Sequence, residues 1–439
     1  MRNKKKNLVV TEGVKHNVLM DKKRKPSWVS AREVKLDNHI SKHNYYVFLW
    51  HAVFLALANN FMDVDTIIPA MMVDAGGSSL QVGILIAIML GGGNFAQLFF
   101  APFLNNQSSK KGYLLGGINV RIFALGGIAL LFYFSSHVSE YYTIWFIFIL
   151  ISLFSFSGAF ANINYVDILG KSVLQKKRKS FFSIKQIISS IFVFLSAFLA
   201  RIVLSEYGYP INYASLFFIA AVLLGIASLG FWRIKEISAA KSKIDGLMKF
   251  IHIIIREIRT NKKFRNYVFL VNTQGICLIL MPFLILYAKK SYNAGGQDIG
   301  NFLLLKVIGG IITGSLLFYF SKKIKYQHML YTTSIVALLI PLFILILPGS
   351  ILFPYIFLAG GIVFTIHMIS ISGVLLEITS NENRALYTGL SGAGNIIPAV
   401  FPLLGGWIIT EFGFTLFFIL LMLIIFLSFP FIYKLDCKK

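Results

Sequence analysis

Long apolar runs, separated by short polar or basic segments, repeat along most of the chain. A helix needs about 20 apolar residues to cross the hydrocarbon core of a bilayer. Twelve runs are this long, so we predict an all-α integral membrane protein with twelve transmembrane helices. The expected ranges are 45–73, 80–104, 112–134, 141–169, 181–205, 211–234, 266–290, 298–320, 327–347, 351–376, 385–411 and 413–434.

The connections between these runs alternate in charge. Those at 74–79, 135–140 and 206–212 contain no Lys or Arg, whereas the intervening connections and the segment 235–265 are basic. Cytoplasmic loops of membrane proteins carry an excess of Lys and Arg. We therefore expect both termini in the cytoplasm. The basic pair at 289–290 is an exception, because it falls on the expected outer side.

The composition also indicates a membrane protein. The residues AVILMFWYC make up 56% of the chain and charged residues only 14%, where soluble domains average about 25%. The net charge of +24 follows the basic connections, so we expect no nucleic-acid partner. Cys277 and Cys437 are too far apart for a metal or redox motif, and Tyr165 replaces the first glycine of a phosphate loop before "GKS". We therefore expect no enzyme activity, cofactor or metal.

The basic segment 235–265 divides the predicted helices six and six. Segments at matched places in the two sets resemble each other, namely 82–103 with 299–320 and 178–186 with 384–392. Repeats related by an axis along the membrane normal are typical of one large class of secondary transporters. The expected parts are a basic cytoplasmic tail at 1–43, a six-helix half at 44–234, a cytoplasmic loop at 235–265, a second half at 266–434 and a cytoplasmic C-terminus at 435–439.

Two cytoplasmic segments carry patterns of their own. Within 247–258, Leu, Phe and Ile recur at helical spacing with bases between them, which predicts an amphipathic helix. This helix would lie on the membrane surface or pack on the helix bundle. The first half of the tail is basic and poor in apolar residues, so we expect disorder there. Ser30 and Glu33 fit a capping box and predict a short helix toward Tyr45.

In helix number, division into halves, orientation and basic central loop, residues 44–434 resemble a major facilitator superfamily (MFS) transporter. Two motifs of that family are incomplete here. In "APFLNNQSSKKG", Ala101 replaces the leading glycine and Asn105 the acid, and Ser321 replaces the acid of the second half. The glycine-rich motif of proton-coupled drug antiporters is missing from 183–205. The resemblance implies transport by alternating access, driven by an ion gradient and not by ATP.

Two carboxylates, Asp63 and Asp65, interrupt the first apolar run, with Asn59 and Asn60 one turn earlier. An ionised carboxylate at the centre of a membrane helix costs about 2.5–3.5 kcal/mol on insertion scales. At about 100° per residue, Asn59, Asp63 and Thr66 share a face, while Asp65 points about 200° away. The two acids cannot enter one cavity unless the helix is broken. We expect Asp63 to line the cavity and Asp65 to face a neighbouring helix or the outer vestibule; the alternative is that both only fix packing.

Basic residues also fall inside predicted helices. Arg121 and Lys306 lie about two turns inside the third and eighth helices, and intramembrane cations are functional candidates by default. Arg121 is expected to pair with an acid of the first helix or to bind an anionic substrate, and a structural ion pair is the alternative. Lys306 has no acid at the matched place in the other half. Lys185 and Arg201, near helix ends, are expected to snorkel.

Other polar groups complete the candidate site. Those expected on the substrate and proton pathway, or in interhelical packing, are Asn94, Gln97, Asn272, Gln274, His367 and Asn395. Acids that end the fourth and tenth helices each precede a basic residue of the next helix. The resemblance implies gate salt bridges from these residues, which are Asp167 with Arg178 and Glu377 with Arg384.

The function expected from the sequence is secondary active transport of a small molecule across the bacterial cytoplasmic membrane. Protons are the expected coupling ion, because Asp63 and Asp65 are the acids buried in the membrane. The aromatic, apolar helices favour export of amphipathic compounds. Uptake of an anionic metabolite is the alternative favoured by Arg121 and Lys306, and a non-transporting receptor or scaffold is the alternative of another class. We expect a monomer whose partners are the substrate, protons and membrane lipids.

Overall fold

The computed structural model describes residues 36–435, apart from 94, 96–98, 101–102, 105–106, 108, 238–246, 321–323, 350 and 379–394. Every regular element in this described part is a helix. The predictions for the tail before residue 36, including its capping box, lie outside the described residues. The same holds for Asn94, Gln97, Ala101, Asn105, Ser321 and Arg384.

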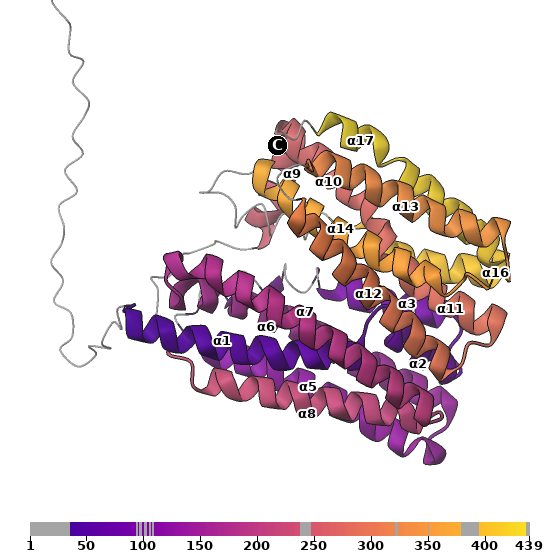
Figure 1. Cartoon of the computed structure of the whole chain (residues 1–439), viewed down its shortest axis with the longest axis horizontal. Coiled ribbons are helices and arrows are strands. Elements are labelled where there is room, and N and C mark those ends of the chain that lie inside the picture. The colour runs from indigo at the N-terminus through magenta and orange to yellow at the C-terminus, as the bar shows by residue number, and fades with distance from the viewer. Residues whose placement is uncertain are drawn as a thin grey trace, which may run out of the picture. The chain divides into compact units, whose positions relative to one another are not determined.

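The helices follow the order of the predicted apolar runs (Figure 1). In the first half they are α1 (Asn38–Asn59), η1 (Asn60–Met62), α2 (Ile67–Asp74), α3 (Ser79–Ala87), η2 (Ile88–Gly92), α5 (Lys111–Tyr133), η3 (Ser135–His137), α6 (Glu140–Ser172), α7 (Gln175–Glu206) and α8 (Ile211–Trp232). The segment between the halves contains α9 (Leu247–Thr260). The second half contains α10 (Lys262–Gln274), η4 (Gly275–Ile279), α11 (Leu280–Tyr292), α12 (Gly296–Tyr319), α13 (Tyr326–Ile346), α14 (Tyr355–Ile378), α16 (Ile397–Phe426) and α17 (Phe429–Lys434).

Ten helical stretches of the described residues are long and apolar enough to cross a membrane. A shorter apolar helix at Ser79–Gly92 lies where the second predicted helix begins. The stretch Ile397–Lys434 reverses direction at Gly413, whose φ of 80° is outside the helical range. The rings of Phe401 and Phe417 are therefore 6.1 Å apart, whereas 16 residues of straight helix would separate them by about 24 Å. The predicted boundary between 385–411 and 413–434 falls at this reversal.

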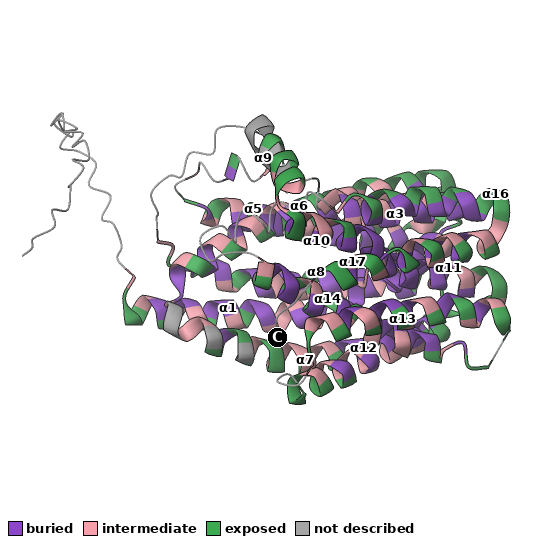
Figure 2. Ribbon diagram, turned by 90° about the horizontal axis from the view of Figure 1, so that it is seen from above, coloured by how far each residue is buried: buried purple, intermediate pink, exposed green. Residues whose placement is uncertain are grey.

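Within each half, helices pack on their neighbours along much of their length. In the first half α1 packs on α7 and α8, and α5 packs on α6 and α8. In the second half α14 packs on α12 and α13. In Figure 2 buried positions lie toward the neighbouring helices and exposed positions lie on the outward faces. Large apolar side chains such as Phe123 and Phe318 are exposed. Such an apolar outer surface is what a membrane-spanning bundle presents to lipid.

The most extensive contacts between the two halves are those of α7 with α12, α3 with α16, and α2 with α11. We call the end of the bundle where α2 and α11 finish the Asp74 end, and the opposite end, where α1 begins, the Asn38 end. Glycines let backbones approach between the halves: a Cβ on Gly83 of α3 would strike the Pro402 carbonyl and lie 3.1 Å from the Gly406 Cα. Close glycine contacts of this kind are common between membrane helices.

Candidate functional site

The first membrane helix is broken at Asp63, between η1 and α2. Asp63 has extended backbone angles (φ −63°, ψ 125°). Its Oδ1 accepts hydrogen bonds from the backbone N–H of Asp65 (3.1 Å), the backbone N–H of Thr66 (2.9 Å) and the Thr66 hydroxyl (2.8 Å). Aspartate side chains favour such local bonds, which replace the hydrogen bonds of a continuous helix. The Asp63 side chain therefore stabilises the break, which changes the direction of the chain at the next two residues.

The broken segment brings both carboxylates of the first helix to one lysine of the second half. The Lys306 ammonium donates to Asp63 Oδ1 and Oδ2 at 3.0 and 2.8 Å and lies 2.6 Å from Asp65 Oδ2. All three side chains are at most 14% exposed. Lys306 also lies over the Phe364 ring, at 5.8 Å from its centroid. We call Asp63, Asp65 and Lys306 the carboxylate–lysine triad.

The expectation that Asp63 and Asp65 point in different directions was wrong, although Asp65 does face a neighbouring helix, α12. Helical periodicity placed Asp65 on a different face from Asp63, toward a neighbouring helix or the outer vestibule. That expectation assumed a continuous helix, and the extended backbone at Asp63 removes the assumption. Of the two nearby amides, Asn59 is exposed, and Asn60 donates to the Val193 carbonyl and the Ser196 hydroxyl of α7. Asn60 therefore fixes packing between η1 and α7.

The triad links the two halves and has an unequal charge. Two ionised carboxylates and one ammonium leave a single negative charge in excess, and one bound proton would neutralise the group. A neutral group costs less to hold away from water than a charged one. The triad can therefore exchange a proton and, at the same time, change the strength of a contact between the halves.

A second link between the halves lies at the Asp74 end. The Lys289 ammonium donates to Asp74 Oδ1 and Oδ2 at 2.7 and 2.8 Å, and the Tyr213 hydroxyl donates to Asp74 Oδ2 at 2.6 Å. The neighbouring Lys290 donates to the Ser79 hydroxyl at 2.6 Å. The basic pair at 289–290, an exception to the charge pattern of the sequence, therefore holds α11 to α2 and α3.

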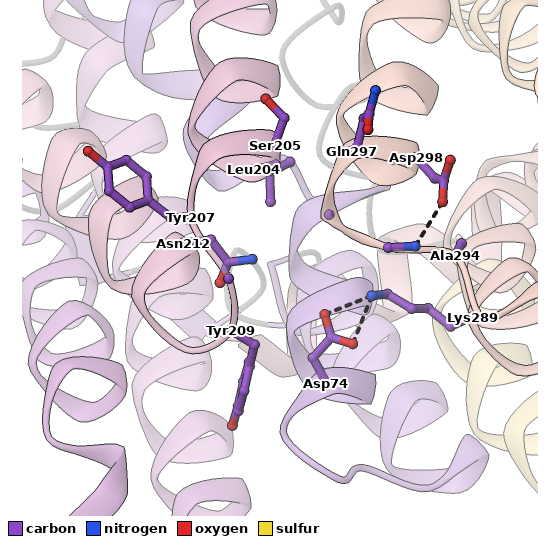
Figure 3. Close-up of a pocket in the computed structure, with 13 residues that line it drawn as sticks. Asp74, Leu204, Ser205, Tyr207, Tyr209, Asn212, Lys289, Ala294, Gln297 and Asp298 are labelled. Carbon is purple, nitrogen blue, oxygen red and sulfur yellow. Dashed lines mark hydrogen bonds and ion pairs between the residues drawn. The ribbon is translucent and has the colours of Figure 1, made fainter.

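The Asp74–Lys289 pair borders a cavity of about 700 Å³, shown in Figure 3. The connection between α7 and α8, together with α2, α11 and the start of α12, lines it. Tyr209 lies on that connection, where burial and the negative charges of Asp74 and Glu140 raise its pKa. The Tyr209 hydroxyl therefore stays protonated at neutral pH. In the sequence, this region was indicated by the basic pair at 289–290, which falls on the expected outer side.

Of the two roles expected for Arg121, pairing with an acid of the first helix was also wrong. The Arg121 guanidinium lies over the Phe154 ring, 4.3 Å from its centroid, and its Nε is buried without a hydrogen-bond partner. Lys185 lies 5.6 Å from the centroid of the Tyr165 ring, so it is held at an aromatic face within the first half. Arg201 donates from Nε to the Asn301 side chain of α12 at 2.5 Å.

Three of the predicted pathway residues hold the second half together. The Asn272 side chain accepts from the backbone N–H groups of Ile396 and Ile397 at 3.0 and 2.8 Å, and so ties the start of α16 to α10. Gln274 donates to the Leu330 carbonyl and the Ser334 hydroxyl of α13.

The side-chain amide oxygen of Gln274 lies 3.3 Å from His367 Nδ1. His367 is 3% exposed and Gln274 fully buried, so this contact belongs to interhelical packing. Asn395 differs from these residues, because its Oδ1 is buried with no hydrogen-bond partner in the described structure.

The gate pair predicted for the first half is replaced by other contacts. Asp167 lies 3.1 Å from the Lys110 ammonium and 2.5 Å from that of Lys171, and Arg178 donates to the carbonyls of Gly170 and Val173. Arg178 therefore binds backbone carbonyls at the end of α6 and does not pair with Asp167. Glu377 is exposed at the end of α14, and its predicted partner lies outside the described residues.

The model of the Major Facilitator Superfamily matches residues 49–394 of this chain. No curated protein sequence matches this chain. Among solved structures, a variant of the nucleoside transporter NupG is 16% identical, with a TM-score of 0.65 and coverage of 89% of this chain and 99% of that one. The inward-open xylose transporter XylE from E. coli is 10% identical, with a TM-score of 0.64 and coverage of 90% and 97%.

A POT family transporter in complex with 5-aminolevulinic acid is 11% identical, with a TM-score of 0.65 and coverage of 90% and 96%. At such identities these structures establish a shared fold. The family model covers most of the chain, from α1 into the segment before α16. The chain therefore belongs to the major facilitator superfamily and is a multi-pass integral membrane transporter, not an enzyme.

Proposed function

We propose that this protein is a proton-coupled secondary transporter that moves a small molecule across the bacterial cytoplasmic membrane by alternating access. The proposed topology has twelve membrane helices, with both termini in the cytoplasm. The chain reversal at Gly413 and the apolar helix Ser79–Gly92 support the helix number. The alternation of basic connections supports the orientation. The abundance of Lys, Ile, Asn and Phe, typical of a low-GC genome, supports a bacterial source.

The observation that carries this proposal is the carboxylate–lysine triad. When both carboxylates are ionised, Lys306 is held to the first half by two attractions. Protonation of one carboxylate removes one of them and leaves a neutral pair. Since the triad bridges α12 and the broken first helix, loss of that attraction lowers the free energy needed to separate the halves there. Proton binding and conformational change then become coupled, as reciprocal linkage requires.

The contacts between the halves are those expected of one conformation in alternating access. Polar contacts between described residues of the two halves extend from the Asp74 end to the triad. With the proposed orientation, the conformation is closed to the outside. Opening outward requires the Asp74–Lys289 pair and the triad to separate. Both halves belong to one chain, which supports a monomer as the transporting unit, with lipid around its apolar surface.

The experiment that tests coupling uses proteoliposomes and a panel of labelled small molecules under an imposed pH gradient. We expect at least one compound to accumulate with the pH gradient, to lose accumulation with a protonophore, and to respond little to a sodium gradient. Asp63→Asn should abolish gradient-driven accumulation and retain exchange of the same compound at equal concentrations. Asparagine can still accept the hydrogen bonds of the break, so the variant removes charge and keeps the local fold.

Asp37→Asn is the matched control. Asp37 caps the start of α1 through Ile40 and lies outside the candidate spans. Asparagine is an equally good N-cap, so this variant should transport like the wild type. Accumulation at the wild-type ratio in Asp63→Asn would overturn proton coupling through the triad.

A second candidate concerns the direction and the substrate. Aromatic composition favoured export of amphipathic compounds, and uptake of an anionic metabolite was the alternative. The cations Arg121 and Lys185 now favour the alternative, because neither has an acidic partner among the described residues. Lys306, the other cation on which the alternative rested, already has two carboxylates and is not available to a substrate.

A further inference from the structure

Three basic side chains from three helices face α6 in the first half. His51 of α1 and Lys185 of α7 both lie at the Tyr165 ring, 5.7 Å and 5.6 Å from its centroid, and Arg121 of α5 lies 4.3 Å from the centroid of the Phe154 ring. Arg121 and Lys185 each lie ten residues beyond the start of their helix. At 1.5 Å per residue this is about 15 Å from the Asn38 end. We call His51, Arg121 and Lys185 the basic cluster.

The basic cluster has no counter-charge in the described part of the chain. Arg121 lies over the Phe154 ring and Lys185 over the Tyr165 ring. Arg121 Nε and His51 Nδ1 are both buried without a hydrogen-bond partner, and His51 is only 6% exposed. Buried polar groups normally have partners, and an unpaired buried charge is costly. The triad shows the usual arrangement, with Lys306 held by two acids.

The position of Arg121 is built into the packing of α5 on α6. A Cβ on Gly158 of α6 would lie 3.4 Å from Arg121 Nε, an ordinary van der Waals distance, so the guanidinium packs against α6 beside the Phe154 ring. Arg121 and Lys185 are both partly exposed. A ligand that reaches the cluster would therefore find two charged donors, an unpartnered imidazole nitrogen and two aromatic rings.

We infer that the basic cluster binds the anionic group, a carboxylate or a phosphate, of a small organic substrate. Arginine presents several N–H donors in a planar fork that matches either group, and Lys185 adds a second positive charge. The rings of Phe154 and Tyr165 contact the apolar part of the same molecule. An anion at this site supplies the counter-charge that the described residues lack. This inference rests on the proposed transport function and adds the chemical class of its substrate.

The test compares pairs of compounds that differ in charge and share their shape. The purified full-length protein in detergent is heated with benzoate or benzamide, with acetate or acetamide, and with glycerol 3-phosphate or glycerol, at equal ionic strength. We expect at least one anion to raise the unfolding temperature more than its neutral partner. Comparison of the carboxylates with the phosphate shows which anionic group the site binds. A phospholipid compared with a matched diacylglycerol shows whether that group belongs to a lipid headgroup.

Variants locate the binding. Arg121→Gln and Lys185→Gln should each raise the apparent Kd of the stabilising anion by about tenfold, the effect of losing one charge-assisted hydrogen bond. Arg121→Lys keeps the charge and should lose less. Arg233→Gln is the matched control, because Arg233 is exposed and lies outside the cluster. It should bind the anion like the wild type.

Two results would overturn the inference: neutral partners that stabilise as well as every anion, or wild-type anion affinity in both Arg121→Gln and Lys185→Gln. Failure of the proposed function looks different, because binding needs no gradient. Anion binding at the cluster without gradient-driven accumulation would refute coupled transport and leave the site intact. Accumulation of neutral or cationic compounds alone would support transport and refute the anion site.

Discussion

The Asp63 carboxylate makes two kinds of contact at once. Its Oδ1 accepts from Thr66 and so holds the break in the first helix, and both of its oxygens receive from Lys306. The carboxylate that shapes the backbone is thus also the one that pairs across the halves. Asp65, two residues later, reaches Lys306 only because of that break. Substitutions at the triad should therefore act through charge balance.

We predict that Lys306→Met lowers the free energy of unfolding by about 3–5 kcal/mol, the usual cost of removing one partner from a buried ion pair. Both carboxylates would then lack a counter-ion in a site at most 14% exposed. Adding Asp63→Asn should recover part of the loss, and adding Asp65→Asn as well should recover most of it. Unfolding temperature in detergent measures all three variants. Equal stability of the single and triple variants would contradict a role for charge balance.

At the scale of helices, the contact between α3 and α16 depends on two facing glycines. A Cβ on Gly406 would lie 2.6 Å from the Ser79 carbonyl, and a Cβ on Gly83 would strike the Pro402 carbonyl. These are backbone atoms that cannot rotate away. The glycines therefore determine how closely the halves approach near the Asp74 end.

We predict that Gly83→Leu prevents closure of the Asp74 end. A cysteine placed at Asn301 should then react several-fold faster with a membrane-impermeant maleimide than in the wild-type background. Gly116→Leu is the control, since no atom lies within 4 Å of a Cβ there and leucine favours a helix over glycine. An unchanged labelling rate in Gly83→Leu would show that α3 and α16 can separate without opening this end.

At the scale of the whole molecule, alternating access requires the Asp74 end to open and close. We predict that a covalent link at positions 74 and 289 stops transport. The experiment uses Asp74→Cys with Lys289→Cys, in a background with Cys277→Ala and Cys437→Ser, and a short reducible cross-linker. Turnover should fall by more than tenfold on cross-linking and return with reductant. Each single-cysteine variant is the control, and full turnover in the linked protein would mean that this end does not move.

We also predict that deletion of residues 1–27 preserves transport turnover per inserted molecule. Transport needs a cavity between the halves, and the polar links between them lie within 63–306. The basic tail should act at the anionic membrane surface, at about 1 kcal/mol per residue near it, and so affect insertion. Uptake normalised to surface-labelled protein measures this. Normal insertion with no transport would assign the tail a role in gating.

The order of the helices and the place of their ends were largely predictable from the sequence. The predicted run at 211–234 became α8 (Ile211–Trp232), and that at 327–347 became α13 (Tyr326–Ile346). The basic segment between the halves contains the expected helix, α9 (Leu247–Thr260). These features are local, because the thickness of the bilayer determines how long an apolar run must be. Asp63 was identifiable as a candidate site residue for the same reason, as an acid inside such a run.

The partner of each charged side chain was decided by the tertiary structure alone. Asp63 and Lys306 are 243 residues apart in sequence, and no spacing rule connects them. The periodicity of the first helix misplaced Asp65, because one carboxylate bonded to the backbone ends the helix on which that periodicity depends. Arg121 lacks an acid for a similar reason: packing of α5 on α6 directs it to Phe154. Charges pair over a few ångströms, and only the folded chain determines which ones come that close.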